Sequence, residues 1–307
     1  MAASSSGSTA ARNNAGDCPA KPSSWPLRAG FLQFRVRFGD PGANLAEVRQ
    51  RLAALAPAPA TLVLLPELWS GGFCYRDLAR QAAETPALLA ALVAEAGRYG
   101  IFLAGSLPEA GSATSIPSSV GNQRLPPGVS VQGVPEDAAI TDRLYNTLFL
   151  VGPEGVADRY RKQQLFAPMA EPDHFRAGPP AGPLAAPWGP VAGLVCFDLR
   201  FPELAAVQVR QGATILLVSA QWPLARREHW RTLLRARAIE NQIFVVACNT
   251  CGRVGDTDFA GSSTIIAPDG EILAEAGEDE AGLTAPLDFS RLVEARRRFM
   301  TAGGICR

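Results

Sequence analysis

Three segments of the sequence each place a side chain that could do chemistry at the end of a predicted strand, namely Glu67, Lys162 and Cys196. A cysteine can attack an electrophilic carbon, a desolvated carboxylate can act as a base, and an ammonium can stabilise a thiolate or an oxyanion. Taken singly, each residue also has a structural interpretation, as an exposed strand-end glutamate, a solvated lysine or a cysteine that packs as a small hydrophobe. Together they favour nucleophilic catalysis by Cys196.

The sequence offers few other partners for a cysteine nucleophile. It contains two histidines, His174 in a proline-rich segment and His229 inside a predicted amphipathic helix. Nothing in the sequence places either imidazole near Cys196, although a cysteine–histidine pair remains an alternative. A desolvated carboxylate can remove the thiol proton in place of histidine, and a nearby ammonium can stabilise the thiolate. The shortage of histidine therefore favours Glu67 as the base and Lys162 as the cation.

Three motifs occur in a fixed order along the chain: Leu-Pro-Glu at Glu67, Tyr-Arg-Lys at Lys162 and Val-Cys-Phe-Asp-Leu-Arg-Phe-Pro-Glu around Cys196. They resemble the Glu–Lys–Cys segments of the nitrilase superfamily, the carbon–nitrogen hydrolases. The resemblance extends from about residue 30 to residue 288. It implies an α/β fold, a four-layer α-β-β-α sandwich of two packed mixed sheets.

The resemblance also implies a role for each residue. Glu67 would be the general base, and Cys196 the nucleophile that forms a thioester. Lys162 and the backbone N–H of Phe197 would bind the oxyanion.

Members of the superfamily often carry a second glutamate shortly after the lysine. Glu171, in Met-Ala-Glu-Pro-Asp, occupies the matching place and would orient Lys162 or the attacking water. Asp173 is its nearest rival.

The segment from Gln221-Trp222-Pro223 to residue 242 resembles the ω-amidase branch of the superfamily. Members of this branch hydrolyse the terminal amide of small dicarboxylic monoamides such as 2-oxoglutaramate and release ammonia. Two alternatives remain within the superfamily, a nitrilase and an N-carbamoyl amino acid amidohydrolase. An alternative of another class is a catalytically silent protein that binds a small molecule.

A substrate with a free carboxylate requires a cation at the far end of the pocket. Arg200, four residues after Cys196, and Arg226 are the candidates. For Arg200, a structural ion pair with Glu203 is an equally good interpretation. The expected aromatic lining of the pocket is Trp222, Phe73 and Tyr145.

Apolar runs of strand length alternate with segments of helical period, which is typical of α/β layering. Asn44 is a possible N-cap of the first helix, and Gly100 suits the C-cap of the second. The predicted helices span residues 44–55, 86–99, 203–211 and 226–241. The predicted strands span residues 29–36, 61–65, 101–107, 144–151, 156–161, 191–196, 214–219, 243–248, 262–267 and 271–275.

The order of these elements predicts one domain with two sheets face to face and helices outside. We expect a disordered N-terminal tail over residues 1–27 and a single hydrolase domain over residues 28–307. A stretch rich in Ser, Gly, Pro and Val, at about residues 110–139, interrupts the domain as an insertion that could cap the pocket.

Composition excludes several other classes of function. With 29 basic and 29 acidic side chains, the chain has no excess charge to bind nucleic acid. It has no apolar run of the ~20 residues that span a bilayer, and no signal peptide, so we expect a cytoplasmic protein. The six cysteines are expected to be reduced, and the pair Cys248 and Cys251 to pack at a strand end. The chemistry requires no metal or organic cofactor, and the family resemblance implies a homodimer or higher homo-oligomer.

Overall fold

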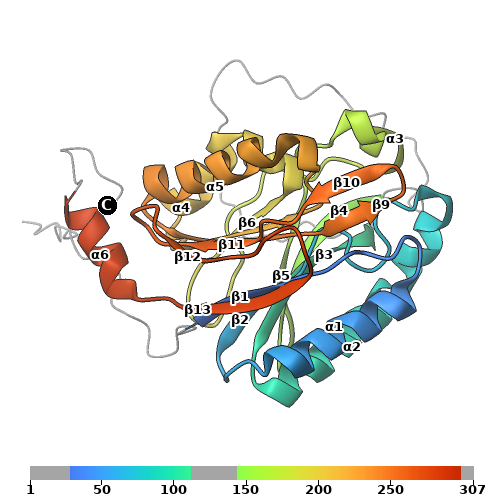
Figure 1. Ribbon diagram of the computed structural model, residues 1–307, viewed down its shortest axis with the longest axis horizontal. Coiled ribbons are helices and arrows are strands. Elements are labelled where there is room, and N and C mark those ends of the chain that lie inside the picture. Colours follow the sequence, from blue (N-terminus) through green and yellow to red (C-terminus); the bar gives the residue numbers. More distant parts are fainter. Residues whose placement is uncertain (1–27, 112–143, 299–307) are drawn as a thin grey trace, which may run out of the picture.

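The apolar runs form two mixed sheets that pack face to face between two pairs of helices (Figure 1). The computed structural model describes residues 28–111 and 144–298. The predicted N-terminal tail and all but the first two residues of the predicted insertion lie outside the described residues. Within them, the four-layer α-β-β-α sandwich predicted from the sequence is confirmed.

The first sheet has six strands in the order β13-β1-β2-β3-β4-β5. Strands β1, β2 and β3 run parallel, whereas β13, β4 and β5 pair antiparallel with their neighbours. The strands are β1 (Arg28–Gln33), β2 (Thr61–Leu64), β3 (Phe102–Ala110), β4 (Leu144–Gly152), β5 (Gly155–Arg161) and β13 (Ala281–Pro286).

The second sheet has five strands in the order β12-β11-β8-β7-β6, with β6, β7 and β8 parallel. A two-stranded ribbon of β9 and β10 lies beside it. The strands are β6 (Ala192–Val195), β7 (Ile215–Ala220), β8 (Phe244–Asn249), β9 (Cys251–Val254), β10 (Thr257–Ala260), β11 (Thr264–Ile266) and β12 (Ile272–Glu275).

Helices cover the outer face of each sheet (Figure 1). Helices α1 (Pro41–Leu55) and α2 (Leu78–Tyr99) cover the first sheet, and α4 (Pro202–Arg210) and α5 (Arg227–Asn241) cover the second. The one-turn helix α3 (Glu171–His174) follows β5, and α6 (Phe289–Arg298) ends the described chain. In the described part of the chain, no helix has the length and apolar character needed to cross a membrane.

Strand β2 shows how the pattern of side chains builds both sides of the first sheet. Leu62 and Leu64 belong to the core between the two sheets, whereas Val63 and Leu65 pack toward α1 and α2. Successive side chains of a strand point to opposite faces, so a continuous apolar run suits a strand that is covered on both faces. All four side chains are fully buried, which stabilises the fold by roughly 1.5–3 kcal/mol each.

The start of the first helix differs from the prediction. Helix α1 begins at Pro41, and Asp40 is its N-cap, because the Asp40 carboxylate accepts a hydrogen bond from the N–H of Ala43 at 2.9 Å. Proline suits the first helical position, since the amide hydrogen it lacks would have no acceptor there. The Asn44 prediction was therefore wrong: this side chain is buried and donates to the carbonyl oxygens of Arg37 and Ser70.

Helix α2 is longer than predicted, because it begins at Leu78 rather than at Pro86. Pro86 lies inside the helix, where it removes one backbone donor. The hydroxyl of the preceding Thr85 donates to the carbonyl of Pro108, at 2.6 Å, and so ties this turn to β3. The predicted end is confirmed, since Gly100 has a φ of 64° and its N–H caps the helix.

Candidate active site

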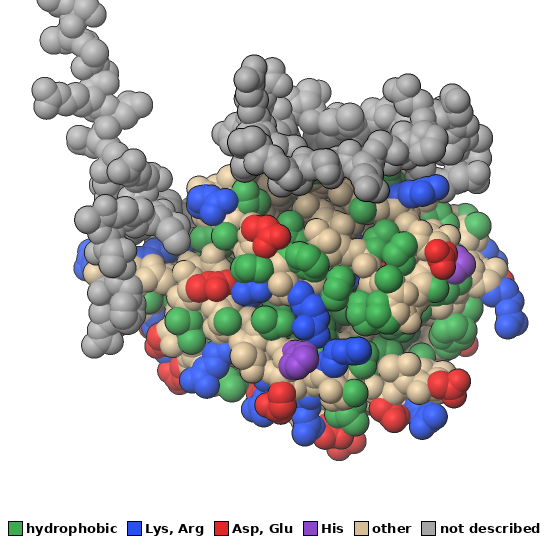
Figure 2. Space-filling view, turned by 90° about the horizontal axis from the view of Figure 1, so that it is seen from above, with side chains coloured by type: hydrophobic (Ala, Val, Ile, Leu, Met, Phe, Trp, Pro, Cys, Tyr) green, Lys and Arg blue, Asp and Glu red, His purple; other side chains and the backbone are tan. Residues whose placement is uncertain are grey.

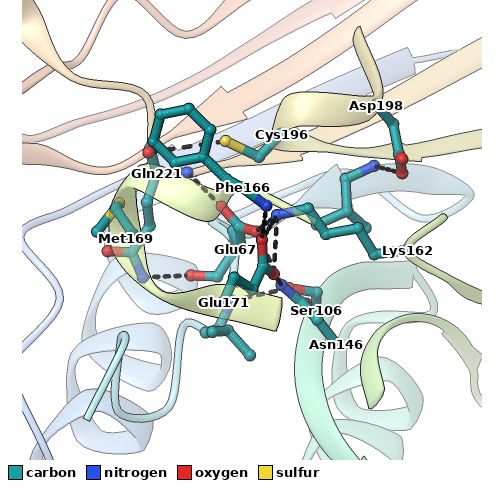
Figure 3. Close-up of polar contacts among 12 residues, drawn as sticks. Glu67, Ser106, Asn146, Lys162, Phe166, Met169, Glu171, Cys196, Asp198 and Gln221 are labelled. Carbon is teal, nitrogen blue, oxygen red and sulfur yellow. Dashed lines mark hydrogen bonds and ion pairs between the residues drawn. The ribbon is translucent and has the colours of Figure 1, made fainter. Parts of the chain in front are cut away.

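The three reactive residues predicted from the sequence come together where strands of the two sheets end (Figure 3). Glu67 follows β2 and Lys162 follows β5, both in the first sheet, whereas Cys196 follows β6 in the second. The side chains of Glu67 and Lys162 are completely buried, and Cys196 is only 7% exposed. The site therefore lies between the sheets, at a position that neither sheet could form alone.

Lys162 connects two buried carboxylates. Its Nζ donates to Oε1 of Glu67 at 2.8 Å, and to Oε1 and Oε2 of Glu171 at 2.9 and 2.7 Å. Burial by itself would lower the pKa of Lys162, but the two carboxylates outweigh burial and raise the pKa well above its usual value. The lysine is therefore an ammonium at every pH at which the protein would be studied.

Glu67 receives hydrogen bonds on both carboxylate oxygens. Its Oε1 accepts from Lys162 and, at 2.8 Å, from Nδ2 of Asn146. Its Oε2 accepts from the backbone N–H of Gln221 at 3.0 Å. Burial raises the pKa of Glu67 above the ordinary 4.5, while Lys162 lowers it. A buried carboxylate with a raised pKa is a better proton acceptor than an exposed one, as a general base requires.

Glu171 is the first residue of α3, and its side chain is fully buried. Besides Lys162, it accepts from the N–H of Phe166 at 2.7 Å and from Nδ2 of Asn146 at 3.1 Å. The rival Asp173 lies on the exposed side of the same turn. The structure thus brings Glu171, and not Asp173, to Lys162.

Cys196 occupies a sharp turn between β6 and the helical segment Cys196–Arg200. Its φ of 46° lies in the left-handed region, which is unfavourable for a cysteine and persists only because the surrounding structure holds it. Burial, and then the charge of Glu67, raise the pKa of the thiol well above its usual value, so the resting thiol is neutral. The N–H of Phe197 lies in the first helical turn, where amides have no acceptor within the helix.

Asp198 joins the nucleophile turn to the loop that carries Lys162. Its carboxylate accepts from the N–H of Val195 at 3.0 Å and from those of Gln163 and Gln164 at 3.2 and 2.7 Å. The hydroxyl of Tyr160 also donates to it, at 3.0 Å. Burial raises the pKa of Asp198 to about 7, against the lowering effect of Lys162 and these donors.

Three further residues of the site were not predicted from the sequence: Asn146, Asp198 and Gln221. Gln221 directly follows β7, so the strand-end rule that found the other residues would have found it too. Its amide Nε2 also donates to the carbonyl of Glu67 at 2.8 Å, and its own carbonyl lies 3.7 Å from Sγ of Cys196. Asn146 lies inside β4, where the signal in the sequence was a pair of polar residues, Asn146 and Thr147, before an apolar run.

A pocket opens from Cys196 to the surface and contains about 260 Å³ of space free of protein atoms, part of it open to solvent. Seen from the side of α4 and α5, hydrophobic side chains gather beside basic ones on this face of the molecule (Figure 2). The lining residues are Phe166, Cys196, Phe197, Arg200, Gln221, Trp222, Pro223 and Arg226.

Two arginines line this pocket without a carboxylate partner among the described residues. Arg200 lies 4.9 Å from the ring of Trp222, and one of its nitrogens is 3.1 Å from Nδ1 of His229. Arg226 lies 5.9 Å from the ring of Phe166. The predicted alternative for Arg200, an ion pair with Glu203, is not formed. Partial burial and the neighbouring charge of Arg226 lower the pKa of Arg200.

Two of the predicted lining residues do not line this pocket. Phe73 packs in a separate apolar cluster with Leu68 and Phe175. The ring of Tyr145 lies under the guanidinium of Arg161, whose Cζ is 4.0 Å from the ring centroid. Both predictions followed from aromatic character alone, which does not distinguish a pocket wall from ordinary packing.

The described part of the chain offers neither histidine to Cys196. His174 stacks on Tyr75 with a ring separation of 3.8 Å, and His229 contacts Arg200. A group of three or more His, Cys, Asp or Glu side chains that could hold a metal ion is likewise not found in residues 28–111 and 144–298. Cys248 and Cys251 are buried free thiols at the end of β8 and the start of β9.

Comparison with known proteins agrees with this geometry. The family model for carbon–nitrogen hydrolases matches residues 28–297. A 2-oxoglutaramate amidase of Bacillus subtilis is 35% identical over 266 residues, which cover 86% of this chain and 92% of the relative. An omega-amidase of Escherichia coli is 29% identical over 275 residues, covering 89% of this chain and 94% of the relative.

Among solved structures, the chain is similar to a variant amidase of Nesterenkonia whose active-site cysteine carries the product of Michael addition of acrylamide. The TM-score is 0.68 and the sequence identity 26%, covering 89% of this chain and 97% of the other. The chain thus belongs to the carbon–nitrogen hydrolase family and is a hydrolase of carbon–nitrogen bonds.

Proposed function

We propose that the protein hydrolyses the terminal amide of a small carboxylate-bearing molecule, as an ω-amidase does, and releases ammonia. The observation that carries this proposal is the pair of arginines, Arg200 and Arg226, in the pocket that also contains Cys196. The names of the relatives, a 2-oxoglutaramate amidase and an omega-amidase, support the same substrate class.

The buried cluster supplies each group that acylation requires. Glu67 takes the proton of the Cys196 thiol, and the sulfur attacks the amide carbon. The electron pair of the C=O bond moves to oxygen, where Lys162 and the N–H of Phe197 stabilise the negative charge. Protonated Glu67 then gives its proton to the amide nitrogen, the C–N bond breaks, and ammonia leaves a thioester on Cys196.

Deacylation uses the same groups in reverse. Glu67 removes a proton from water, the hydroxide attacks the thioester carbon, and the C–S bond breaks as the thiol regains its proton. Glu171 holds Lys162 through both of its oxygens, so the ammonium remains in place while charge develops and disappears beside it.

The distal end of the pocket matches a carboxylate. Arginine binds carboxylates through two parallel N–H···O bonds, and such charge-assisted pairs are the strong ones. The next arginines along the chain, Arg227 and Arg231, are in ion pairs with Glu278 and Glu275, so they are not available to a ligand. Arg200 and Arg226 are the arginines of this region that remain available among the described residues.

The test compares ammonia release from glutaramate and from its uncharged analogue valeramide. We expect turnover of glutaramate and its complete loss in Cys196→Ala. Replacing Arg200 or Arg226 with alanine should raise KM for glutaramate about tenfold to a hundredfold, because each removes a charge-assisted contact worth roughly 1.5–3 kcal/mol. Valeramide, which lacks the carboxylate, should be a poor substrate for every variant. Arg231→Ala is the matched control and should behave as the wild type does.

Other outcomes would identify the alternatives. Preference for 4-cyanobutanoate would indicate a nitrilase, and preference for N-carbamoyl-β-alanine a carbamoylase. Valeramide turned over as well as glutaramate would refute the carboxylate site. A wild-type protein that binds glutaramate but turns over none of these compounds would be a catalytically silent binding protein.

We also propose that the protein is a cytoplasmic homo-oligomer built from a single domain over residues 28–307. The family resemblance supports this proposal, and light scattering coupled to size-exclusion chromatography tests the oligomeric part. A single species with the mass of one chain, 32.4 kDa, would contradict it.

A further inference from the structure

One buried carboxamide contacts both carboxylates of the cluster. Asn146 is fully buried, and its Nδ2 donates to Oε1 of Glu67 at 2.8 Å and to Oε1 of Glu171 at 3.1 Å. Its backbone carbonyl accepts from the N–H of Lys162 at 2.9 Å. The Asn146 side chain therefore holds both carboxylates that contact the Lys162 ammonium, although it carries no charge itself (Figure 3).

The contacts of Glu67 divide unequally between its two oxygens. Oε1 accepts from two donors inside the cluster, Lys162 and Asn146, and a carboxylate oxygen has about two lone-pair sites. Oε2 accepts from one donor, the backbone N–H of Gln221. Oε2 is thus the oxygen with a site left for a proton.

The orientation of the Asn146 amide is also informative. Both of its hydrogens are used on carboxylates, whereas its Oδ1 is buried and has no hydrogen-bond partner in the described structure. Turning the amide around would place Oδ1 against the negative oxygens of Glu67 and Glu171, which is unfavourable. The fold therefore keeps an unpaired buried oxygen in order to point two donors at the carboxylates, and packing alone would not require this.

We propose that Asn146 is a positioning residue that assigns different tasks to the two oxygens of Glu67. By filling the second site on Oε1, it leaves Oε2 as the oxygen that takes the Cys196 proton. The inference rests on the proposed function, because it specifies how the base of that reaction is held.

The proton path is then defined at the level of atoms. The thiol proton moves to Oε2 of Glu67 as the bond between Sγ and the substrate carbon forms. The same proton moves from Oε2 to the amide nitrogen as the C–N bond breaks. Oε1 keeps its bonds to Lys162 and Asn146 throughout, so the carboxylate does not rotate between the two transfers.

The test is the pH dependence of kcat/KM for glutaramate in Asn146→Ala. A hydrogen bond to the charged form of a carboxyl lowers its pKa. Removing the bond should therefore shift the acid limb of the profile, where kcat/KM falls at low pH, to a pH about one unit higher. We expect kcat to fall about tenfold to a hundredfold, because the base is less well placed, while KM changes by less than about twofold.

A second variant and a control keep the test decisive. Asn146→Asp has the same shape as the wild type but adds a carboxyl to the cluster, so its acid limb should move up at least as far; it carries the test if the alanine variant does not fold. Asn241→Ala removes another buried carboxamide, whose bonds go to Arg237 and Glu240 on α5. This control should lower the melting temperature and leave the acid limb unchanged.

The same limb is measurable without a substrate, from the rate at which iodoacetamide alkylates Cys196 across pH, followed by mass spectrometry. A folded Asn146→Ala that keeps the wild-type limb and kcat would overturn the inference and leave Asn146 a structural residue. Activity that survives in Cys196→Ala would instead overturn the proposed function, so the two failures are distinguishable.

Discussion

Replacing Lys162 with methionine would remove the single positive charge from the buried cluster at nearly constant side-chain length. In the wild type, Nζ lies within 2.7–2.9 Å of oxygens of Glu67 and Glu171, and all three side chains are shielded from water. In Lys162→Met, the two carboxylates would face each other with no cation between them. The variant should lose activity and, because of this uncompensated charge, also lose stability.

The magnitude follows from the burial of the pair. Removing one partner of a buried ion pair typically costs about 3–5 kcal/mol, since the remaining charge has neither its partner nor water. For a domain of this size, each kcal/mol changes the melting temperature by about 2–4 °C. We therefore expect Lys162→Met to melt roughly 6–20 °C below the wild type at pH 8.

The loss should depend on pH in a defined direction. The pKa of Glu67 in the folded protein is raised above its ordinary 4.5. The stability that the protonated Glu67 carboxyl contributes is therefore fully present below pH 4.5 and is lost as pH rises through the pKa of the folded protein. Lys162 lowers this pKa, so without it the pKa rises further and the loss at high pH grows. Lowering the pH toward the pKa of Glu67 protonates this carboxyl and removes its negative charge, so the difference from the wild type should be smaller at pH 5 than at pH 8.

The measurement is thermal unfolding of both proteins at pH 5 and pH 8, at one protein concentration. Arg80→Met is the matched control, because Arg80 pairs with Glu84 at 2.7 Å on the surface and such pairs contribute little to stability. Its melting temperature should equal that of the wild type at both pH values. A Lys162→Met protein with wild-type stability at pH 8, or with equal losses at pH 5 and pH 8, would refute the reasoning.

Two further predictions concern the base and the packing around it. The acid limb of wild-type kcat/KM for glutaramate should lie above pH 4.5, because burial raises the pKa of Glu67. The variant Glu67→Gln should have no turnover. An acid limb at or below pH 4.5 would exclude Glu67 as the base. Gly105→Ala should lower the melting temperature, since the added Cβ would lie 2.8 Å from Leu65 and 3.0 Å from Trp69. An unchanged melting temperature would show that these neighbours can move apart at little cost.

The strand-end residues could be predicted because the rule behind them is local. Glu67, Lys162 and Cys196 each follow a run of residues that reads as a strand, and reactive side chains at strand ends collect at one edge of a sheet. Their juxtaposition still required the two sheets to pack in one particular way. That information came from the resemblance of three ordered motifs, because no single motif contains it.

Asn146 and β13 show why the rest could not be predicted. Asn146 lies within β4, and its importance depends on two carboxylates that reach it from the segment after β2 and from α3, which no local pattern encodes. Strand β13 has the sequence Ala-Gly-Leu-Thr-Ala-Pro, with weak strand propensity. It forms because it pairs antiparallel with β1, some 250 residues earlier, where Arg28 lies opposite Pro286.

The charges of the site also specify how a substrate would enter. The cluster of Glu67, Glu171 and Lys162 has two carboxylates and one ammonium, a net charge of −1 at the buried end of the pocket. Arg200 and Arg226 place positive charge toward its solvent-exposed side. A molecule with an amide at one end and a carboxylate at the other is repelled if its carboxylate enters first, toward the buried cluster. It is attracted if the amide enters first and the carboxylate stays beside the arginines. The accepted orientation brings the amide to Cys196, so the buried negative charge selects the bond that is cleaved as well as providing the base that cleaves it.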